Sequence, residues 1–272
     1  PDEAFINWLK EEKSALLKYL SERQIFSEEA FERLLKEEGI ITDSPRLETA
    51  NDNLVQAIFP ATSLQQGFVF HYLSQPQDDA YRVQLLLDLH HDLDVPLYIQ
   101  AWRLTSIRFP ILRTAFEWDS EGEVLQVVTK NPSIDESKFT HIDLSHLGEA
   151  EREQAITDIQ QQDRKLPFDL NQPGLLRFTI IKQANDLYTI LKTEHHSIAD
   201  GWSGGVLLHT VHGFYAALVD NETPKVVEET AYLETQAYYV RQRSAVDKFW
   251  QSAKKRFGQP NDINSLLTYP CD

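Results

Sequence analysis

Residues 187–204 read LYTILKTEHHSIADGWSG, and they carry the pattern of a strand that ends shortly before a helix. The residues before Glu194 are mostly β-branched or apolar without a helical period, which predicts a strand. The pattern GVLLHTVHGFYAALV over 205–219 follows almost at once and predicts a helix. His195 and His196 therefore lie in a loop between a strand and a helix. Reacting groups of α/β proteins are commonly placed in such loops.

Length and composition limit the class of protein. The 272 residues, 42% of them hydrophobic, permit one large domain or two small lobes with a sizeable core. The net charge of −16 argues against non-specific nucleic-acid binding, which needs clustered Lys and Arg. No apolar run approaches the ~20 residues that span a bilayer, and no leader indicates secretion, so we expect no membrane contact. Cys271 is the single cysteine, which excludes an internal disulfide and fits a reducing cytoplasm.

The chain divides into a short acidic front and a larger mixed domain. Apolar residues at helical spacing predict a helical hairpin in residues 1–39, followed by a linker over 40–53. The hairpin is either a docking element for another protein or a linker that packs on its own neighbour. The remainder mixes helical and strand patterns, which predicts an α/β domain. Helices are expected over 63–73, 96–109, 149–165 and 205–219, and strands over 81–89, 113–118, 123–129, 175–183 and 187–193.

The histidine pair is the candidate for chemistry, because imidazole exchanges protons near neutral pH. We expect Gly201 to relieve crowding or to adopt a positive φ in the turn. A zinc site is a rival use of His195, His196 and Asp200, but adjacent histidines tend to point in different directions and no strong further ligand is near. Ser203 lies in GWSGG, which matches the Gly-x-Ser-x-Gly nucleophile elbow. The histidines precede this serine, however, whereas that class places its histidine far downstream.

Four further histidines have plainer explanations. His90 and His91, with Asp94, form a second His-rich stretch, but no Gly follows it and it precedes a solvent-side turn. His209 and His212 share one face of their expected helix and lie well along it, which indicates packing or surface positions. We therefore assign no chemistry to either group.

The segment HHSIADGWS (195–203) resembles the HHxxxDG signature of condensation domains in non-ribosomal peptide synthetases, which the wider chloramphenicol-acetyltransferase-like superfamily shares. Other segments agree in the same order. IFPATSLQQGFVFH (58–71) is similar to LSPLQEGMLFH, RFPILRTAF (108–116) to RHExLRTxF, LPFDLNQPGLLRF (166–178) to PFDL…PLLR, and YLETQAYY (232–239) with FW (249–250) to a Tyr-x-Asp-Tyr…Trp segment and its trailing Phe-Trp. The departures are Phe109 and Pro110, where His and Glu are frequent, and Glu234 and Tyr238, where Asp and Trp are usual.

The resemblance covers about residues 54–272 and implies an α/β fold. This fold is a chloramphenicol-acetyltransferase-like lobe with a mixed sheet flanked by helices, preceded by the small helical segment. Residues 54–225 would form the N-terminal lobe, and 226–272 the start of a second lobe that is largely missing. We therefore expect this piece alone to be a poor catalyst, because a one-lobed site leaves a thioester exposed to water and unpositioned.

The resemblance also implies a reaction. Donor and acceptor carrier-protein domains each present a phosphopantetheine-linked thioester, and the acceptor amine attacks the donor thioester to form a peptide bond. No metal or tightly bound cofactor is required. By motif match, His196 lies beside the attacking amine, where it removes a proton, orients the amine or stabilises the tetrahedral intermediate. His195 is expected to be structural support.

The other motif residues are expected to shape the site. The resemblance implies that Asp200 turns away from the cleft and pairs with Arg113, because a buried carboxylate needs a paired cation. With Gly201, this pair would hold the shape of the loop. Trp202 and Ser203 are expected to line the cleft.

The resemblance leaves other functions open. The SLQQGFVFH opening is closer to variants that accept a D-configured donor, or that combine epimerisation with condensation. An epimerisation domain shares the histidine pair, although the DGWS ending favours condensation. A stand-alone acyltransferase acting on soluble acyl-CoA is a further alternative, but the DFGWG-type motif of the plant branch is absent. A last alternative is an interaction module, in which residues 1–39 recruit an upstream synthetase subunit and the lobe is inert.

Overall fold

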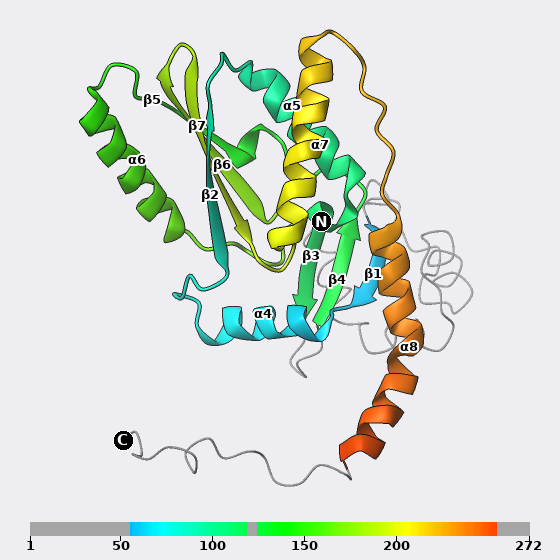
Figure 1. Ribbon diagram of the computed structural model, residues 1–272. Helices are drawn as coiled ribbons and strands as arrows, with labels where there is room; N and C mark the ends of the chain where they lie inside the picture. Colours follow the sequence, from blue (N-terminus) through cyan, green and yellow to red (C-terminus); the bar gives the residue numbers. More distant parts are fainter. Residues whose placement is uncertain (1–54, 119–123, 255–272) are drawn as a thin grey trace, which may run out of the picture.

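The computed structural model describes residues 55–118 and 124–254 (Figure 1). The helical hairpin expected over 1–39 and the linker expected over 40–53 lie outside these described residues. Within the described ranges, the chain forms two sheets with helices around them, which confirms the predicted α/β fold.

The larger sheet has four strands in the order β2 (Arg82–Leu89), β7 (Leu187–His195), β6 (Leu176–Ala184) and β5 (Phe139–Asp143). β2 and β6 both pair antiparallel with β7, and β5 pairs parallel with β6, so the sheet is mixed as expected. The register places Arg82 opposite His195, at the end of the sheet. β7 is thus held on both edges, and His196 follows directly from it.

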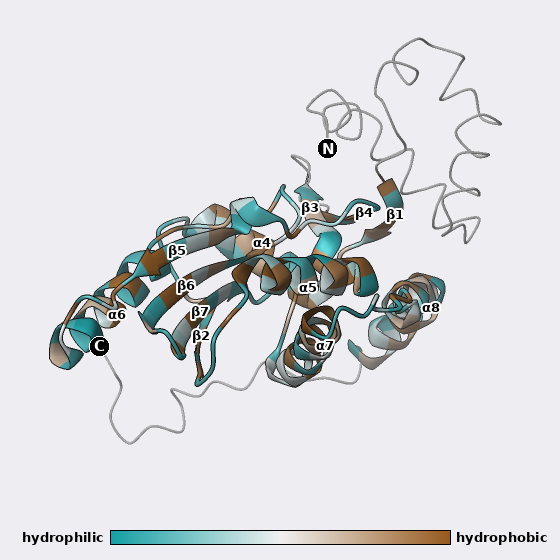
Figure 2. Cartoon of the chain, turned by 90° about the horizontal axis from the view of Figure 1, so that it is seen from above, coloured by the Kyte–Doolittle hydropathy of each residue, from teal (hydrophilic) through white to brown (hydrophobic). Residues whose placement is uncertain are grey.

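Helices lie on both faces of this sheet (Figures 1 and 2). α6 (Glu149–Arg164) lies on one face, where the Asp163 carboxylate accepts a hydrogen bond from Thr193 Oγ1 of β7 at 2.5 Å. α5 (Val95–Arg108) and α7 (Gly201–Val219) lie on the other face and pack against each other. Because both faces are covered, β7 is buried along nearly its whole length, as its run of apolar residues predicts.

The smaller sheet is antiparallel and has the order β1 (Val55–Pro60), β4 (Val124–Thr129) and β3 (Thr114–Trp118). The pairing of β3 with β4 confirms the predicted hairpin. β1 is not among the expected strands, and its pairing with β4 decides its conformation. After β1 the chain enters α4 (Ser63–Ser74), which crosses beneath the ends of both sheets in Figure 1.

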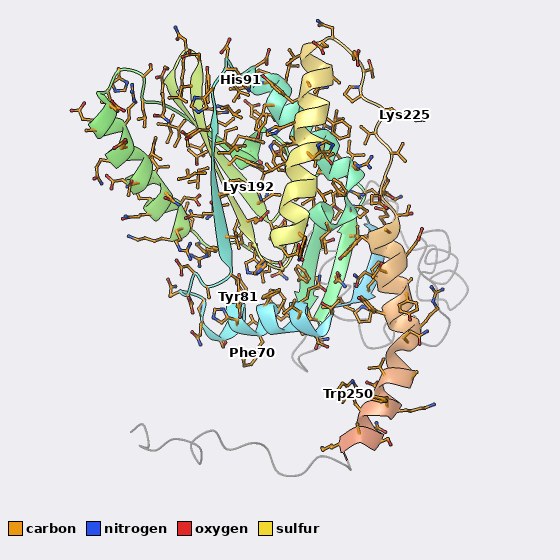
Figure 3. The ribbon with its side chains drawn as sticks, in the orientation of Figure 1. Phe70, Tyr81, His91, Lys192, Lys225 and Trp250 are labelled. Carbon is orange, nitrogen blue, oxygen red and sulfur yellow. The ribbon has the colours of Figure 1, made fainter. Side chains whose placement is uncertain are left out.

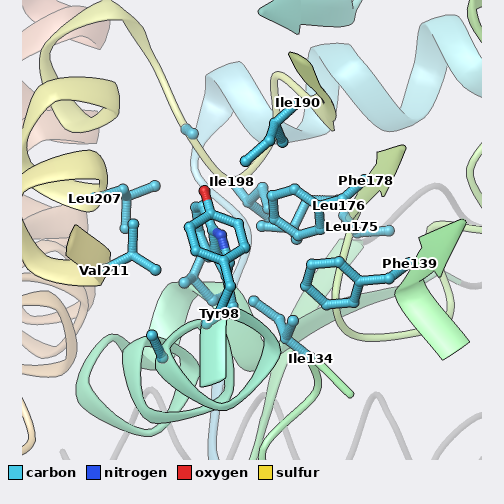
Figure 4. Close-up of a cluster of buried hydrophobic side chains, with 14 of the residues drawn as sticks. Tyr98, Ile134, Phe139, Leu175, Leu176, Phe178, Ile190, Ile198, Leu207 and Val211 are labelled. Carbon is cyan, nitrogen blue, oxygen red and sulfur yellow. The ribbon is translucent and has the colours of Figure 1, made fainter. Parts of the chain in front are cut away.

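One hydrophobic core joins the sheets and the helices. Its side chains come from α5, α7 and both sheets, and Figure 4 shows several of them around Tyr98. The ring centroids of Trp102 and Phe178 lie 4.5 Å apart, and Phe139 stacks on Phe178 at 4.6 Å. Aromatic pairs at such distances contribute about 0.5–1.5 kcal/mol each beyond the burial of their area. Phe116 of β3 belongs to the same core, so both sheets form one body.

Capping residues decide where the helices begin. The Asp94 carboxylate accepts a hydrogen bond from the Leu97 N–H at 3.0 Å and thereby starts α5. α4, α5 and α6 end within one residue of their expected bounds. α7 instead begins at Gly201, four residues before its predicted start, because the Asp200 carboxylate caps it by accepting from the N–H of Ser203.

α8 (Ala231–Lys254) lies in the segment that we expected to open a second lobe. Its first turns pack on the smaller sheet, where Ala237 is buried with Phe59 and Val128. The expected boundary between two lobes stays a prediction.

Gly174, two residues before β6, generates a test of the fold. Its φ is +74°, and a Cβ there would lie 2.5 Å from the Ser133 carbonyl oxygen. We predict that Gly174→Ala lowers the free energy of unfolding by about 2 kcal/mol or more, because an L-residue is strained at this φ and its methyl group collides with backbone. Urea denaturation measures the change. Gly67→Ala in α4, where a Cβ meets nothing within 4 Å, is the control and should raise stability by up to about 1 kcal/mol. Equal effects of the two substitutions would contradict this assignment.

Candidate active site

His196 is the first residue after β7, where the chain turns toward α7. Its backbone N–H donates to the Tyr81 carbonyl oxygen at 2.9 Å, which ties the turn to the residue before β2. Its ring Nδ1 lies 2.6 Å from the Ala199 carbonyl oxygen. Two hydrogen bonds thus hold the backbone and the half-buried ring of His196.

The contact with Ala199 decides the tautomer of His196. A carbonyl oxygen only accepts hydrogen bonds, so Nδ1 carries the proton. In the neutral ring, Nε2 then keeps its lone pair. A lone pair in this position can take a proton from a bound amine or accept a hydrogen bond that orients it. The local geometry therefore provides the atom that acid–base chemistry needs.

His195 has a different environment from its neighbour. It is 6% exposed, and its Nδ1 accepts a hydrogen bond from the Ser197 backbone N–H at 3.2 Å. The ring of Phe168 packs edge-on at 6.2 Å. Burial, followed by the nearby cation of Arg82, lowers the pKa of His195 to about 4, so its ring is neutral at pH 7. These contacts suit the support role that we expected, which stays a prediction.

The expected pair between Asp200 and Arg113 does not form. Asp200 is exposed at the start of α7, where hydrogen bonds from Ser203 hold the pKa of its carboxyl below the usual range. Arg113 is 1% exposed, and its guanidinium contacts the Glu228 carboxylate at 2.5 Å and donates to the Ser106 carbonyl oxygen at 2.8 Å. The expectation was wrong because the segment between α7 and α8 brings another anion to the buried cation, while helix capping holds Asp200 at the surface.

The next three motif residues form the first turn of α7. Gly201 is helical, and a Cβ there would meet nothing within 4 Å, so the expectation of crowding or positive φ at this position is wrong. Ser203 Oγ accepts from the Asp200 N–H at 2.7 Å, so the hydroxyl belongs to the helix cap and not to a nucleophile elbow. Trp202 is 90% exposed. A role of Trp202 and Ser203 in lining a cleft stays a prediction.

Two features beside the histidines escape sequence reasoning. Phe68 of α4 stacks on His196 with 5.7 Å between ring centroids, and nothing in the pattern of α4 indicates that it crosses to the end of β7. Lys192 and Glu194 form an ion pair with side chains only 5% and 8% exposed (Figure 3 labels Lys192). They share one face of β7 because they are two residues apart. Two opposite charges, two residues apart within an otherwise apolar strand, could have predicted this ion pair from the sequence.

Among the other histidines, His71 lines a small pocket together with His195, whereas His91 and His212 lie elsewhere. His91 and His212 line a groove with Tyr98 and Tyr215, near the end of β7 that is remote from His196. Within residues 55–118 and 124–254, no group of three or more His, Cys, Asp or Glu side chains could hold a metal ion. None of the helices described in these ranges is long and apolar enough to cross a membrane.

Comparisons with known sequences agree with the motifs. The family model described as Condensation domain matches residues 55–269. The N-(5-amino-5-carboxypentanoyl)-L-cysteinyl-D-valine synthase of Penicillium rubens is 34% identical over 219 residues, which are 80% of this chain and 6% of that protein. Bacitracin synthase 3 of Bacillus licheniformis is 26% identical over 213 residues, which are 78% of this chain and 3% of that protein. The chain therefore spans only a small part of these relatives.

Solved structures show the same fold. The starter condensation domain of rhizomide synthetase has a TM-score of 0.61 at 19% identity, covering 75% of this chain and 52% of that one. The first condensation domain of the calcium-dependent antibiotic synthetase, in complex with a substrate analogue, has a TM-score of 0.58 at 23% identity, covering 75% of this chain and 49% of that one. The chain spans about half the length of these structures.

The change of partner at Arg113 can be tested by stability measurements. We predict that Glu228→Gln lowers the free energy of unfolding by about 1–3 kcal/mol, because it leaves a buried guanidinium without its anion. Asp200→Asn keeps a capping oxygen and should cost less than about 0.5 kcal/mol. Chemical denaturation of both single variants and of the double variant provides the comparison. If Asp200→Asn lowers the free energy of unfolding more than Glu228→Gln does, Arg113 pairs with Asp200 and not with Glu228.

The lowered pKa of His195 predicts a pH dependence of stability. The unfolded chain takes up a proton near pH 6.5, whereas the folded ring does so only near pH 4. The unfolded state therefore binds more protons between these values, and the free energy of unfolding falls as the pH drops from about 6.5 to about 4, by on the order of 3 kcal/mol from this group. Chemical denaturation at a series of pH values gives the free energy of unfolding of each protein. Between pH 6.5 and pH 4 this free energy should change less with pH for His195→Gln than for the wild type. His209→Gln, at an exposed position of α7, should keep the wild-type slope; identical slopes in all three proteins would refute the assignment.

Proposed function

The chain belongs to the condensation domain family, and from this membership we propose that it forms amide bonds between carrier-bound aminoacyl and peptidyl thioesters in non-ribosomal peptide synthesis. The observation that carries the proposal is the 2.6 Å contact between His196 Nδ1 and the Ala199 carbonyl oxygen, which requires the proton on Nδ1. It leaves Nε2 as an acceptor for the reacting amine.

The proposed reaction transfers an acyl group from sulfur to nitrogen. The amine of the acceptor attacks the carbonyl carbon of the donor thioester and forms a C–N bond, and the C–S bond then breaks. One proton leaves the attacking nitrogen, and one proton is finally held by the thiol that departs. His196 Nε2 either accepts the amine proton, orients the amine or donates a hydrogen bond from its protonated form to the tetrahedral oxyanion. All three roles need only this ring nitrogen within hydrogen-bond reach of the reacting atoms.

The proposal implies two protein partners and no resident cofactor. A donor and an acceptor carrier domain would each deliver a thioester on a phosphopantetheine arm, which is substrate and not a group held by this chain. Residues 1–39 are the proposed contact with an upstream synthetase subunit. We also propose a cytoplasmic location, because the sequence contains a single cysteine.

Loss of product on removal of the imidazole tests the role of His196. In the full protein that carries these residues, with loaded donor and acceptor carriers, we predict that His196→Ala lowers the rate of dipeptidyl-thioester formation by about 100-fold or more, because the reacting amine loses its hydrogen-bond partner. Intact-protein mass spectrometry of the acceptor carrier measures the product.

The control is His209→Ala, which removes an exposed imidazole from α7 and should keep the wild-type rate. A rate in His196→Ala within about 3-fold of the wild type would rule out the proposed role.

Chiral analysis of the donor residue distinguishes condensation from epimerisation and from a dual domain. Inversion with amide formation indicates a dual domain, whereas solvent-deuterium exchange at the donor α-carbon without any amide product indicates an epimerisation domain. If both carriers bind but neither product nor exchange is found, the interaction-module hypothesis replaces the enzyme.

A further inference from the structure

We propose that Phe68 is a positioning residue for His196: its ring forms the wall that holds the imidazole plane with Nε2 directed at the reacting amine. The inference rests on the proposed function for its chemical meaning, but the contacts that support it belong to the fold. Among the motif segments, this position carried no expected role.

The contacts of Phe68 single it out within α4. Its ring stacks on His196 with 5.7 Å between centroids and an interplanar angle of 28°. The same ring meets His195 edge-on at 6.2 Å and 86°. Both distances lie in the range where aromatic rings attract one another. Phe68 is therefore in ring contact with both members of the histidine pair.

The two hydrogen bonds of His196 leave a need for such a wall. The contact of its backbone N–H with the Tyr81 carbonyl oxygen holds the main chain, and the contact of Nδ1 with the Ala199 carbonyl oxygen holds one edge of the ring. A single hydrogen bond at one edge still permits the ring to tilt about that bond. The face of Phe68 opposes this tilt, because tilting would drive the imidazole into a packed ring.

Phe68 is itself held in place from several sides. It is 6% exposed, and the Tyr81 ring packs edge-on against it at 4.7 Å. Figure 3 shows Tyr81 between α4 and the adjoining end of β2. α4 is fixed at its start by the capping box of Thr62 and Gln65, and Gln65 Nε2 donates to Gln126 Oε1 of β4 at 3.0 Å. The helix that carries Phe68 is thus fixed to the smaller sheet by a hydrogen bond between side chains.

Phe70 provides a matched comparison on the same helix. It is also a phenylalanine, but it is 72% exposed, and Figure 3 shows it on the outer side of α4. In the segment similar to LSPLQEGMLFH, Phe68 falls where that pattern has Met, a flexible side chain that also makes favourable contacts with aromatic rings. Met is therefore the conservative replacement at this position.

The test combines turnover with a chemical measure of His196 in the full protein. For Phe68→Ala we expect kcat of dipeptidyl-thioester formation to fall about 10–100-fold, while KM for the loaded acceptor carrier changes less than about 3-fold. The reason is that a displacement of the imidazole by about 1 Å removes its alignment with the amine without removing substrate binding. The kcat of Phe68→Met should lie within about 3-fold of the wild-type value, and the kcat of Phe70→Ala should equal the wild-type value.

A second experiment measures the accessibility of His196. Diethyl pyrocarbonate labels unprotonated imidazole, and peptide mass spectrometry gives the labelling rate at each histidine. Labelling of His196 should rise several-fold in Phe68→Ala.

Labelling of His209, exposed on α7, should stay constant in the same samples. A rise at His209 as large as that at His196 would mean general loosening and would overturn the positioning role, as would a kcat within 2-fold of the wild type. If Phe68→Ala fails to fold, Phe68→Leu decides by the same two readouts. If the wild type forms no product, the proposed function fails, while the labelling rates of His196 still decide whether Phe68 holds its ring.

Discussion

Hydrogen bonding along both edges of β7 sets the position of the histidine pair relative to the helices around it. β2 and β6 fix its register, so the chain leaves the sheet at one defined point, with His195 opposite Arg82. A slip of one residue would send every side chain of the strand to the other face. The register therefore buries His195 among aromatic rings. It leaves His196 with Nδ1 bound to the Ala199 carbonyl oxygen and with Nε2 as the atom for a substrate.

The smaller sheet contributes to the same site from a distance. Gln126 of β4 accepts a hydrogen bond from Gln65 of α4 and donates to Gln236 of α8 at 2.9 Å. These amides are buried, so each needs the others as partners. They join β4, α4 and α8, and α4 carries Phe68 to the histidine pair. The site is thus built by two sheets, although the histidines belong to one.

Burial of a cation organises the chain beside the smaller sheet. The guanidinium of Arg113 lies in an environment that lowers its pKa by desolvation, so it requires acceptors on several sides. Carbonyl oxygens of Ser106 and Thr129 and the carboxylate of Glu228 supply them. Glu228 belongs to the segment that leads into α8, so this ion pair also fixes where the chain returns to the smaller sheet.

Local hydrophobic period and motif spacing were enough to predict the mixed α/β class, most of the helices and strands, and the position of the histidine pair after a buried strand. The sequence could not determine the partner of Arg113, since Glu228 and Asp200 are both acidic residues remote from it along the chain. It also could not place Phe68 against His196, 128 positions away. Such contacts arise only when strand register and helix packing bring remote segments together. The tertiary structure therefore decided which cation, anion and aromatic ring meet, and how the imidazole is held.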